Sequence, residues 1–355
     1  SAGRIHVPFP AGKLLIEPPE VYQILDGERI PVPAAFLLDE NNVSFQLGPY
    51  ESREPLFANP VVSMITYLGG AGRDRALAMA IDGTGCAYIA GETTSRQFRM
   101  PAGREQPRRS VDLFVTKYRI EDSLPIYTTF IGGNSEERVL GIVADREGNA
   151  YLCGETLSPD FPQTNALPYA TRRAQSWDAF VTRLDPQGRI SDFSSRLGGS
   201  RDEHAYAICL DNATNIYIAG ATRSEDFPVS DETRFAAPEG SQNAFAVKID
   251  PFSHSLVYSR TLGGTGRDAA YDIAVDSDGR VLLAGETSSR DFPLRAAVQS
   301  RYGGGVCDAF VVKLTADGAR PIFATYLGGD SDDRAYGAAL DVLGDCYIVG
   351  ETASR

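Results

Sequence analysis

The sequence has few of the residues from which most catalytic and metal sites are built. Its 355 residues include three histidines, one tryptophan and five cysteines, and no two cysteines have the Cys-x-x-Cys spacing of a zinc site. It also contains no nucleophile elbow, no His-Glu-x-x-His motif and no phosphate-binding loop. We therefore predict no catalytic residues, no metal site and no cofactor.

Basic charge is scarce as well. Lysine and arginine number 34 against 47 aspartates and glutamates, which gives a net charge of −13. Nucleic acids and anionic membrane surfaces require a basic face, so neither is expected as a partner, whereas cationic partners and metal ions are compatible with this charge. No apolar run reaches the roughly 18 residues of a membrane-spanning helix. We expect no membrane span.

The five cysteines are scattered and odd in number. This placement predicts mainly buried thiols that act as small apolar residues, with one or two disulfides as the alternative. The chain has no initiator methionine and no signal peptide, and it stops within a repeat unit at Arg355. We therefore expect it to be processed or cut from a longer protein.

Glycine is abundant, with 35 residues, and it marks an internal repeat. A Gly-Gly pair recurs at steps of 63, 66, 65 and 65 residues, beginning at Gly69, Gly132, Gly198, Gly263 and Gly328. A Gly-Glu-Thr triplet with one divergent copy and an Asp-Ala-Phe triplet with two keep the same phase. Three markers in constant phase establish a repeat architecture.

Each copy contains four predicted strands. In the first copy, residues 76–81 alternate small and large side chains, and the turn Asp82-Gly83-Thr84-Gly85 leads to a second strand over 86–93. A long loop precedes the third strand, 111–118, and a short turn precedes the fourth, 126–131. One such sheet leaves two open edges, so the copies are expected to pack face to face in a ring. The predicted fold is an all-β propeller of four-stranded antiparallel blades.

Two of these copies carry a specific resemblance. LGGSRDEHAYAICLDNATNIYIAGATRSEDFP from Leu197 and LGGTGRDAAYDIAVDSDGRVLLAGETSSRDFP from Leu262 resemble the SBBP repeat family of bacterial β-propellers. The resemblance covers roughly residues 60–355, and residues 32–60 resemble the segment that commonly leads into the first repeat. It implies an exported or surface-associated protein, as is typical of this family, whose members have largely undefined biochemical roles. The family name implies seven blades, and this chain departs from that number.

The repeats predict five blades. Four complete copies span about 70–133, 134–199, 200–264 and 265–329. Residues 330–355 supply only the first two strands of a fifth copy, and the other two are expected near the N-terminus, at 43–47 and 61–68. A closing blade made of 330–355 and 41–69 would complete the ring. Residues 1–40 are then an N-terminal extended arm with a β-hairpin whose turn is Asp26-Gly27.

Two acidic positions recur in every copy. The aspartate that ends the first strand, represented by Asp82, is expected to cap an Asx turn rather than to bind a metal. The second acidic position precedes the first strand and is occupied by Asp74, Glu137, Glu203, Asp268 and Asp333. The residue that follows each of them is expected to pair across the sheet: Arg75 with Glu92, Arg138 with Glu155, Arg334 with Glu351, His204 with Ala221, and Ala269 with Glu286. These are interpreted as ion pairs that order the preceding loop, with a ligand-binding ring at the channel mouth as the alternative.

Two further features lie in the long loops after the second strands. The Asp-Phe-Pro triplets, which begin at Asp160, Asp226 and Asp291, are expected to anchor these loops through a buried phenylalanine. Trp177, the single tryptophan, precedes the third strand of the second copy and is expected to be a packing residue, with a sugar platform as the alternative.

The sequence favours a non-enzymatic extracytoplasmic interaction or scaffold module, located in the periplasm, on the cell surface or in the medium. Long connections emerge on one face of the propeller and short turns on the other, so a protein or cell-surface partner is expected on the long-loop face. The residues expected to make contact are Arg75, Arg138, His204, Arg334 and Trp177. The alternative is a carbohydrate-binding lectin or glycoside-active enzyme that uses the channel mouth.

Overall fold

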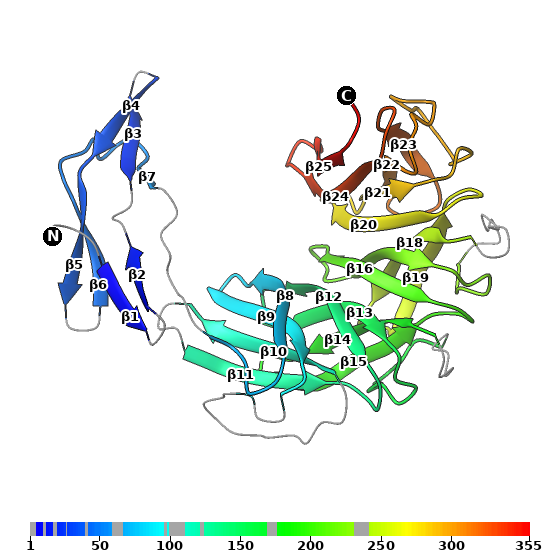
Figure 1. The fold of residues 1–355 in the computed structure, drawn as a ribbon, viewed down its shortest axis with the longest axis horizontal. Helices are drawn as coiled ribbons and strands as arrows, with labels where there is room; N and C mark the ends of the chain where they lie inside the picture. Colours follow the sequence, from blue (N-terminus) through cyan, green and yellow to red (C-terminus); the bar gives the residue numbers. More distant parts are fainter. Residues whose placement is uncertain are drawn as a thin grey trace. The chain divides into compact units, whose positions relative to one another are not determined.

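The structure is a computed structural model that describes residues 5–9, 12–16, 20–25, 27–39, 42–58, 67–95, 98, 111–120, 124–168, 176–230 and 241–355. Regular structure in this part of the chain is entirely β (Figure 1). None of it is a helix that could cross a membrane. The chain forms two compact units, Ser1–Tyr67 and Leu68–Arg355.

The described residues of the first unit form three small sheets. Its strands are β1 (Ile5–Phe9), β2 (Gly12–Ile16), β3 (Val21–Leu25), β4 (Glu28–Val32), β5 (Ala34–Asp39), β6 (Asn42–Leu47) and β7 (Phe57–Ala58). β3 lies between β4 and β7, and Gly27 in the β3–β4 turn has a positive φ of 81°. The buried Gln23 amide donates to the Glu51 and Glu54 carbonyls at 2.7 and 3.0 Å. This side chain therefore fixes the loop that leads into β7.

The second unit contains four complete four-stranded antiparallel sheets and one two-stranded sheet. The first sheet is β8 (Asp74–Ile81), β9 (Cys86–Thr93), β10 (Asp112–Arg119) and β11 (Leu124–Ile131). The second is β12 (Glu137–Ala144), β13 (Ala150–Thr156), β14 (Asp178–Leu184) and β15 (Ile190–Leu197). The third is β16 (Glu203–Leu210), β17 (Ile216–Thr222), β18 (Asn243–Asp250) and β19 (Ser255–Leu262). The fourth is β20 (Asp268–Val275), β21 (Val281–Thr287), β22 (Asp308–Leu314) and β23 (Pro321–Leu327), and the last is β24 (Asp333–Leu340) with β25 (Cys346–Thr352).

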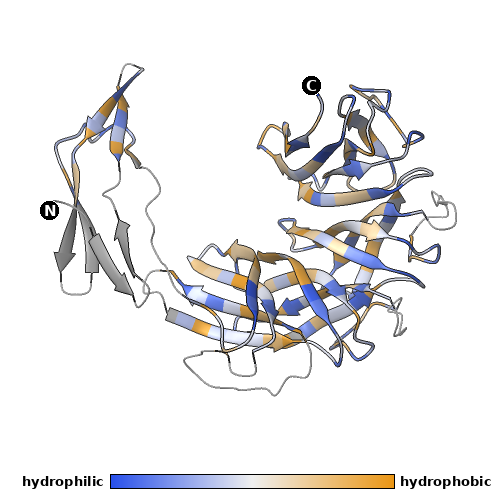
Figure 2. Ribbon diagram, viewed as in Figure 1, coloured by the Kyte–Doolittle hydropathy of each residue, from blue (hydrophilic) through white to orange (hydrophobic). Residues whose placement is uncertain are grey.

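The first strands of these sheets are neighbours in space. β8, β12, β16, β20 and β24 contact one another in that order, as the blades of a β-propeller do around its axis (Figure 1). Hydrophobic residues recur along the strands (Figure 2), and the buried ones form a separate core between each pair of sheets. The predicted β-propeller fold is confirmed.

The predicted cross-strand pairs are confirmed, but for a reason that the sequence did not reveal. Arg75 lies opposite Glu92, and the other four pairs have the expected partners. The turn is one residue longer than assumed, because Ile81 rather than Asp82 ends the ladder, opposite Ala87. A β-bulge between Ala76 and Ala78 then restores the register. The same bulge occurs in all five copies.

The repeat markers converge at one point in each blade. A Cβ atom on Gly132 would lie 2.5 Å from Asp112 Oδ1 and 2.7 Å from Glu137 Oε2, so only glycine fits between these carboxyl groups. The next residue, Gly133, is packed equally closely against Asp160 of the Asp-Phe-Pro triplet. The second acidic position is therefore a buried acceptor beneath the Gly-Gly turn, rather than part of the ion pairs beside it.

The aspartate that ends each first strand has the predicted capping role. Asp82 Oδ1 accepts hydrogen bonds from the backbone N–H groups of Thr84 and Cys86 at 2.9 and 3.0 Å. Its Oδ2 accepts the Tyr88 hydroxyl at 2.8 Å and lies 3.4 Å from Lys117 Nζ. Desolvation would raise the pKa of Asp82. The hydrogen bonds to its carboxylate, of which that from the Thr84 hydroxyl has the largest effect, outweigh desolvation and lower this pKa to about 2.

The Asp-Phe-Pro and cysteine predictions also hold in large part. Phe161, Phe227 and Phe292 are buried, each against the phenylalanine of the following strand. All five cysteines are free thiols. Cys86, Cys153 and Cys307 are buried, but Cys346 is exposed because β25 lacks the covering that equivalent strands have.

The closing blade stays a prediction. β25 pairs with β24, and β6 pairs with β5. A third blade strand needs both of its edges for its neighbours in the blade, whereas one edge of residues 43–47 is already paired with β5. The division between units falls after Tyr67 rather than after residue 40. Residues 61–66, expected in the outer strand, lie outside the described residues.

Candidate functional site

The channel-mouth site is formed where the first and second strands of each blade reach the long-loop face. Its framework is a set of cation–carboxylate pairs within blades. Arg75 and Glu92 are 3.7 Å apart, Arg138 and Glu155 are 3.0 Å apart, and Arg334 and Glu351 are 2.7 Å apart. The strand register places these side chains opposite each other on one face of each sheet.

Two further contacts tie neighbouring blades together. Glu155 also binds His204 Nδ1 of the third blade, so this nearly buried carboxylate bridges two blades. Arg334 Nε lies 2.7 Å from Glu286 Oε2 of the fourth blade, while its Nη1 holds Glu351. Single exposed ion pairs contribute little stability, but shared partners fix the side chains in one arrangement. The mouth therefore has a rigid, charge-balanced rim.

A ladder of tyrosines accompanies this rim. Tyr206, Tyr271 and Tyr336 are the extra residues of the bulges in the last three copies. The Tyr206 and Tyr271 rings are 5.2 Å apart, the Tyr271 and Tyr336 rings are 5.6 Å apart, and His204 stacks on Tyr206 at 5.8 Å. Burial, with the Glu155 and Glu286 charges, raises the pKa of Tyr206 to about 12. The ladder therefore offers neutral hydroxyl groups and ring faces.

Trp177 joins this arrangement from the second blade. The Arg138 guanidinium lies 4.6 Å from the centre of the Trp177 ring, a cation–π contact. The Trp177 backbone N–H donates to Asp202 Oδ1 at 3.1 Å, and its carbonyl accepts the Glu203 N–H at 2.7 Å. Trp177 is half-buried and held in place, as expected of a packing residue.

Glu155 thus connects Arg138 with His204, and Arg138 in turn contacts Trp177. Arg75 pairs within the first blade, whereas Arg334 pairs with glutamates of both the fourth and the last blade. Sequence reasoning missed the tyrosines. Their signal was present, since the same offset carries tyrosine in three copies and leucine (Leu77 and Leu140) in the others. Only the bulge places that position on the channel side.

The rim is interrupted between the third and fourth blades. Ala221 occupies the position of the rim glutamates, and Ala269 that of the rim cations. Both alanines are buried, so no rim ion pair forms at this junction. Tyr206 and Tyr271 meet here instead, edge to face at 61°.

The carboxyl groups of Glu351, Glu137 and Glu203 have shifted pKa values. The Arg334 guanidinium, followed by the Tyr336 hydroxyl, lowers the pKa of Glu351. Desolvation raises the pKa of Glu137 and of Glu203 to about 7, but both side chains are buried beneath the Gly-Gly turns. In the described part of the chain, no three His, Cys, Asp or Glu side chains are grouped as metal ligands.

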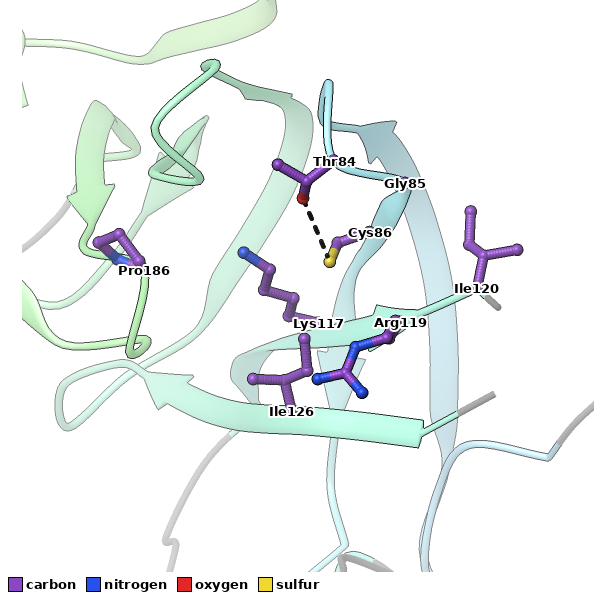
Figure 3. A pocket seen from close by; sticks show the side chains of 8 residues that line it. All are labelled: Thr84, Gly85, Cys86, Lys117, Arg119, Ile120, Ile126 and Pro186. Atoms are coloured by element: carbon purple, nitrogen blue, oxygen red, sulfur yellow. Dashed lines mark hydrogen bonds between the residues drawn. The ribbon is translucent and has the colours of Figure 1, made fainter. Parts of the chain in front are cut away.

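Apart from the channel mouth, a cleft with a volume of about 720 Å³ lies on the short-turn side of the first two blades (Figure 3). Thr84, Cys86, Lys117 and Pro186 are among the residues that line it. The ammonium group of Lys117 is already paired with Asp82, and Cys86 Sγ accepts the Thr84 hydroxyl. These polar groups therefore serve the turn rather than a ligand.

The comparisons with known proteins agree with this fold. Residues 257–293 match the SBBP β-propeller repeat, and residues 1–61 match a domain of unknown function, DUF7948. No curated protein matches the chain.

Several solved structures are similar at low identity. The acylaminoacyl peptidase of Pyrococcus horikoshii is 10% identical with a TM-score of 0.35, over 74% of this chain and 35% of that one. This chain thus spans about a third of the peptidase. A glucose dehydrogenase is 11% identical with a TM-score of 0.39, over 93% and 96% of the two chains. The GH43 β-xylosidase/α-arabinofuranosidase CoXyl43, from a compost microbial metagenome, is 12% identical with a TM-score of 0.33, over 82% and 86%. Similarity this low assigns no activity to this chain.

Proposed function

We propose that this β-propeller with SBBP repeats is a non-enzymatic interaction module that binds a protein or cell-surface partner on its long-loop face, outside the cytoplasm. The partner rests on the rim of the channel-mouth site, which is formed by Arg75, Arg138, His204 and Arg334. His204 stacks on Tyr206 of the tyrosine ladder, and Arg334 shares Glu351 with Tyr336. The resemblance to exported repeat proteins supports the location.

The single observation that carries this proposal is that Arg75, Arg138, His204 and Arg334 at the rim each contact a carboxylate. Glu155 is shared by Arg138 and His204, and Arg334 is shared by Glu286 and Glu351. A general acid needs an accessible group with a pKa near the working pH. The carboxyl groups with a pKa of about 7, Glu137 and Glu203, are buried. Such a rim suits recognition better than proton transfer.

Carbohydrate binding is the second candidate, and the tyrosine ladder favours it. Tyr336 is 49% exposed, and its hydroxyl is held by Glu351 at 2.8 Å. The aromatic face can stack on a sugar ring, and the fixed carboxylate beside it can accept hydrogen bonds from the sugar hydroxyl groups. A lectin or a glycoside-active enzyme would place its ligand over Tyr336 and Tyr271.

Photo-crosslinking in the producing cell tests the main proposal. A photoreactive phenylalanine replaces exposed Tyr336 on the long-loop face, and a matched one replaces exposed Val342 in the β24–β25 turn on the short-turn face. We expect a discrete crosslinked product from position 336 and none from position 342. Products from position 342 alone would overturn the proposal.

A turnover screen on polysaccharides and glycosides separates the candidates. The interaction module predicts no sustained turnover. Turnover that a single substitution such as Glu351→Gln abolishes would establish the enzyme instead, and saturable sugar binding without turnover would establish the lectin.

A further inference from the structure

The outer edge of β25 lies open in the fifth blade. Among the described residues β25 pairs only with β24, whereas the second strand of each complete blade also pairs with a third strand (Figure 1). Those four second strands are largely buried, but β25 is exposed along most of its length. On the fourth blade, Leu327 is 50% exposed, although Ile131, Leu197 and Leu262 at the same position of the other blades are 1%, 1% and 2% exposed. The edge of β25 is therefore an acceptor for one more strand.

The complete blades show which side chain fits beside the glycine of the second strand. In each of them the third strand places a phenylalanine directly opposite this glycine, as Phe114 lies opposite Gly91. A Cβ atom on Gly91 would lie 2.7 Å from the Phe114 ring, so the ring packs on bare backbone. The phenylalanines of the next three blades also lie in the cores shared with the preceding blades. Gly350 holds this position in β25 and is exposed, so a site for a phenylalanine is open.

The third strand carries a cation three residues after this phenylalanine, on its opposite face. Lys117 Nζ lies 4.7 Å from the centre of the Tyr88 ring and 3.4 Å from Asp82 Oδ2. The third blade repeats both contacts, at 4.9 and 3.7 Å. Tyr347 and Asp341 hold the same two positions in the fifth blade, where the Tyr347 hydroxyl donates to Asp341 Oδ2 at 3.3 Å. In the described part of the chain no lysine or arginine pairs with Asp341, so a site for a cation is open as well.

We propose that the edge of β25 accepts an extended segment of a partner protein in which a phenylalanine is followed three residues later by a lysine or arginine. The added strand runs antiparallel to β25, with the phenylalanine over Gly350 and the cation over the Tyr347 ring beside Asp341. Main-chain hydrogen bonds to the open edge supply affinity, and the two side chains supply specificity. This inference goes beyond the rim and does not depend on the proposed function.

A segment of another protein fits this edge better than the alternatives. Residues 43–47, expected to be the third strand of the closing blade, pair with β5, and Phe45 is followed three residues later by Gly48 rather than by a cation. The third strands of a second copy of the chain lie inside its complete blades. The net charge of −13 also favours a basic segment.

Isothermal titration of the intact chain with the peptide VDLFVTKYR, which is the sequence of residues 111–119, tests the acceptor. We expect saturable one-to-one binding and protection of the β25 amides from hydrogen exchange. The matched peptide VDLKVTFYR has the same composition but exchanges the phenylalanine and the lysine, so that each meets the site of the other. It should bind more weakly, on the order of tenfold or more.

Two variants of the chain locate the contact. Tyr347→Ala removes the ring on which the lysine packs and should weaken binding of VDLFVTKYR several-fold. Val342→Ala is the control and should leave binding unchanged, because the equivalent turn residue Arg146 is exposed even in a complete blade.

Absence of binding to the intact chain, or equal binding of the two peptides, would overturn the inference. Binding that appears only after removal of residues 1–60 would overturn it too, because the N-terminal segment would then be the occupant of this edge, as the composite blade requires. The peptide comparison keeps the test decisive if Tyr347→Ala does not fold.

Discussion

His204 on β16 is hydrogen-bonded through Nδ1 to Glu155 on β13, which joins the third blade to the second at the channel mouth. The same carboxylate holds Arg138 of its own blade at 3.0 Å. One glutamate that is 5% exposed therefore sets the positions of both Arg138 and His204. Its loss should matter more than the loss of a rim glutamate in solvent.

Replacement of Glu155 by glutamine should destabilise the propeller by roughly 1–3 kcal/mol, because two charge-assisted contacts of a nearly buried carboxylate are lost. Glu351→Gln is the matched control, since the Glu351 side chain is 54% exposed and solvent screens its ion pair. Chemical denaturation measures both. Equal losses in the two variants would contradict a special role for the Glu155 bridge.

The buried carboxyl groups predict a pH dependence of stability. The pKa of Glu137 and of Glu203 is raised from 4.5 to about 7 in the folded state, mainly by desolvation. Between these pH values the folded chain keeps protons that the unfolded chain has released, so stability is highest below pH 4.5 for these groups and falls as the pH rises through 7. Each group should contribute on the order of 1–3 kcal/mol to this fall.

Thermal or urea unfolding between pH 5 and pH 8, roughly the window set by these pKa values, measures the effect. Glu137→Gln keeps the acceptor for the Thr156 hydroxyl but cannot ionise, so it should flatten the slope. Glu147→Gln changes an exposed residue in the turn after β12 and should leave the slope unchanged. The lowered pKa of Asp82, about 2, acts only at more acidic pH. A slope unchanged by Glu137→Gln would show that the carboxyl group is ionised throughout.

The second blade contains a buried ion pair at two positions where the other blades have no lysine or arginine. Arg196 Nη1 lies 3.1 Å from Asp178 Oδ2, and both side chains are 1% exposed. Arg196→Thr should cost about 3–5 kcal/mol, because it leaves the buried carboxylate without this cation.

The third blade supplies the control for this pair, since it has Asn243 and Thr261 at the two positions. The double variant Asp178→Asn with Arg196→Thr should recover much of the lost stability. Urea denaturation of the single and double variants decides the matter, and a double variant no more stable than Arg196→Thr would show that the arginine acts through packing.

The two ends of the blade array predict ring closure. Ile142, Ile208 and Ile273 are 6%, 7% and 4% exposed, whereas Met79, at the same position of β8, is 65% exposed. Within the array these isoleucines share a core with the second strand of the preceding blade. On β25, the last such strand, Tyr347 and Val349 are 58% and 66% exposed. We predict that the two exposed surfaces are the halves of one more interface between blades.

If these surfaces meet in a closed ring, Met79→Ala should cost about 2 kcal/mol or more, as Ile208→Ala should inside the array. An exposed methionine would cost less than about 0.5 kcal/mol. Removal of residues 1–60 should also lower the stability severely, if the N-terminal segment supplies strands of the closing blade. A truncated chain that melts like the intact one would refute the composite blade.

The pairings at the rim show how far sequence reasoning reached. Arg75 opposite Glu92 was predicted from the offsets alone, because a meander with short turns has one register that keeps its apolar face buried. The prediction rested on two errors that cancelled, a turn one residue too short and an unrecognised bulge. A bulge has no composition of its own, so it cannot be read from one copy.

The sequence by itself determined the repeat, the blade and the capping aspartates, because these depend on local periodicity and on turn chemistry that recurs in every copy. Only the tertiary structure decided which residues form a site. The bulge brings Tyr206 and Tyr271 together, and packing between blades joins Glu155 to His204. Ser176, Arg223 and Arg267 lie in different loops that are distant in the chain, yet they line one cleft. Contacts between blades depend on how whole sheets stack, and no local pattern in the sequence specifies that.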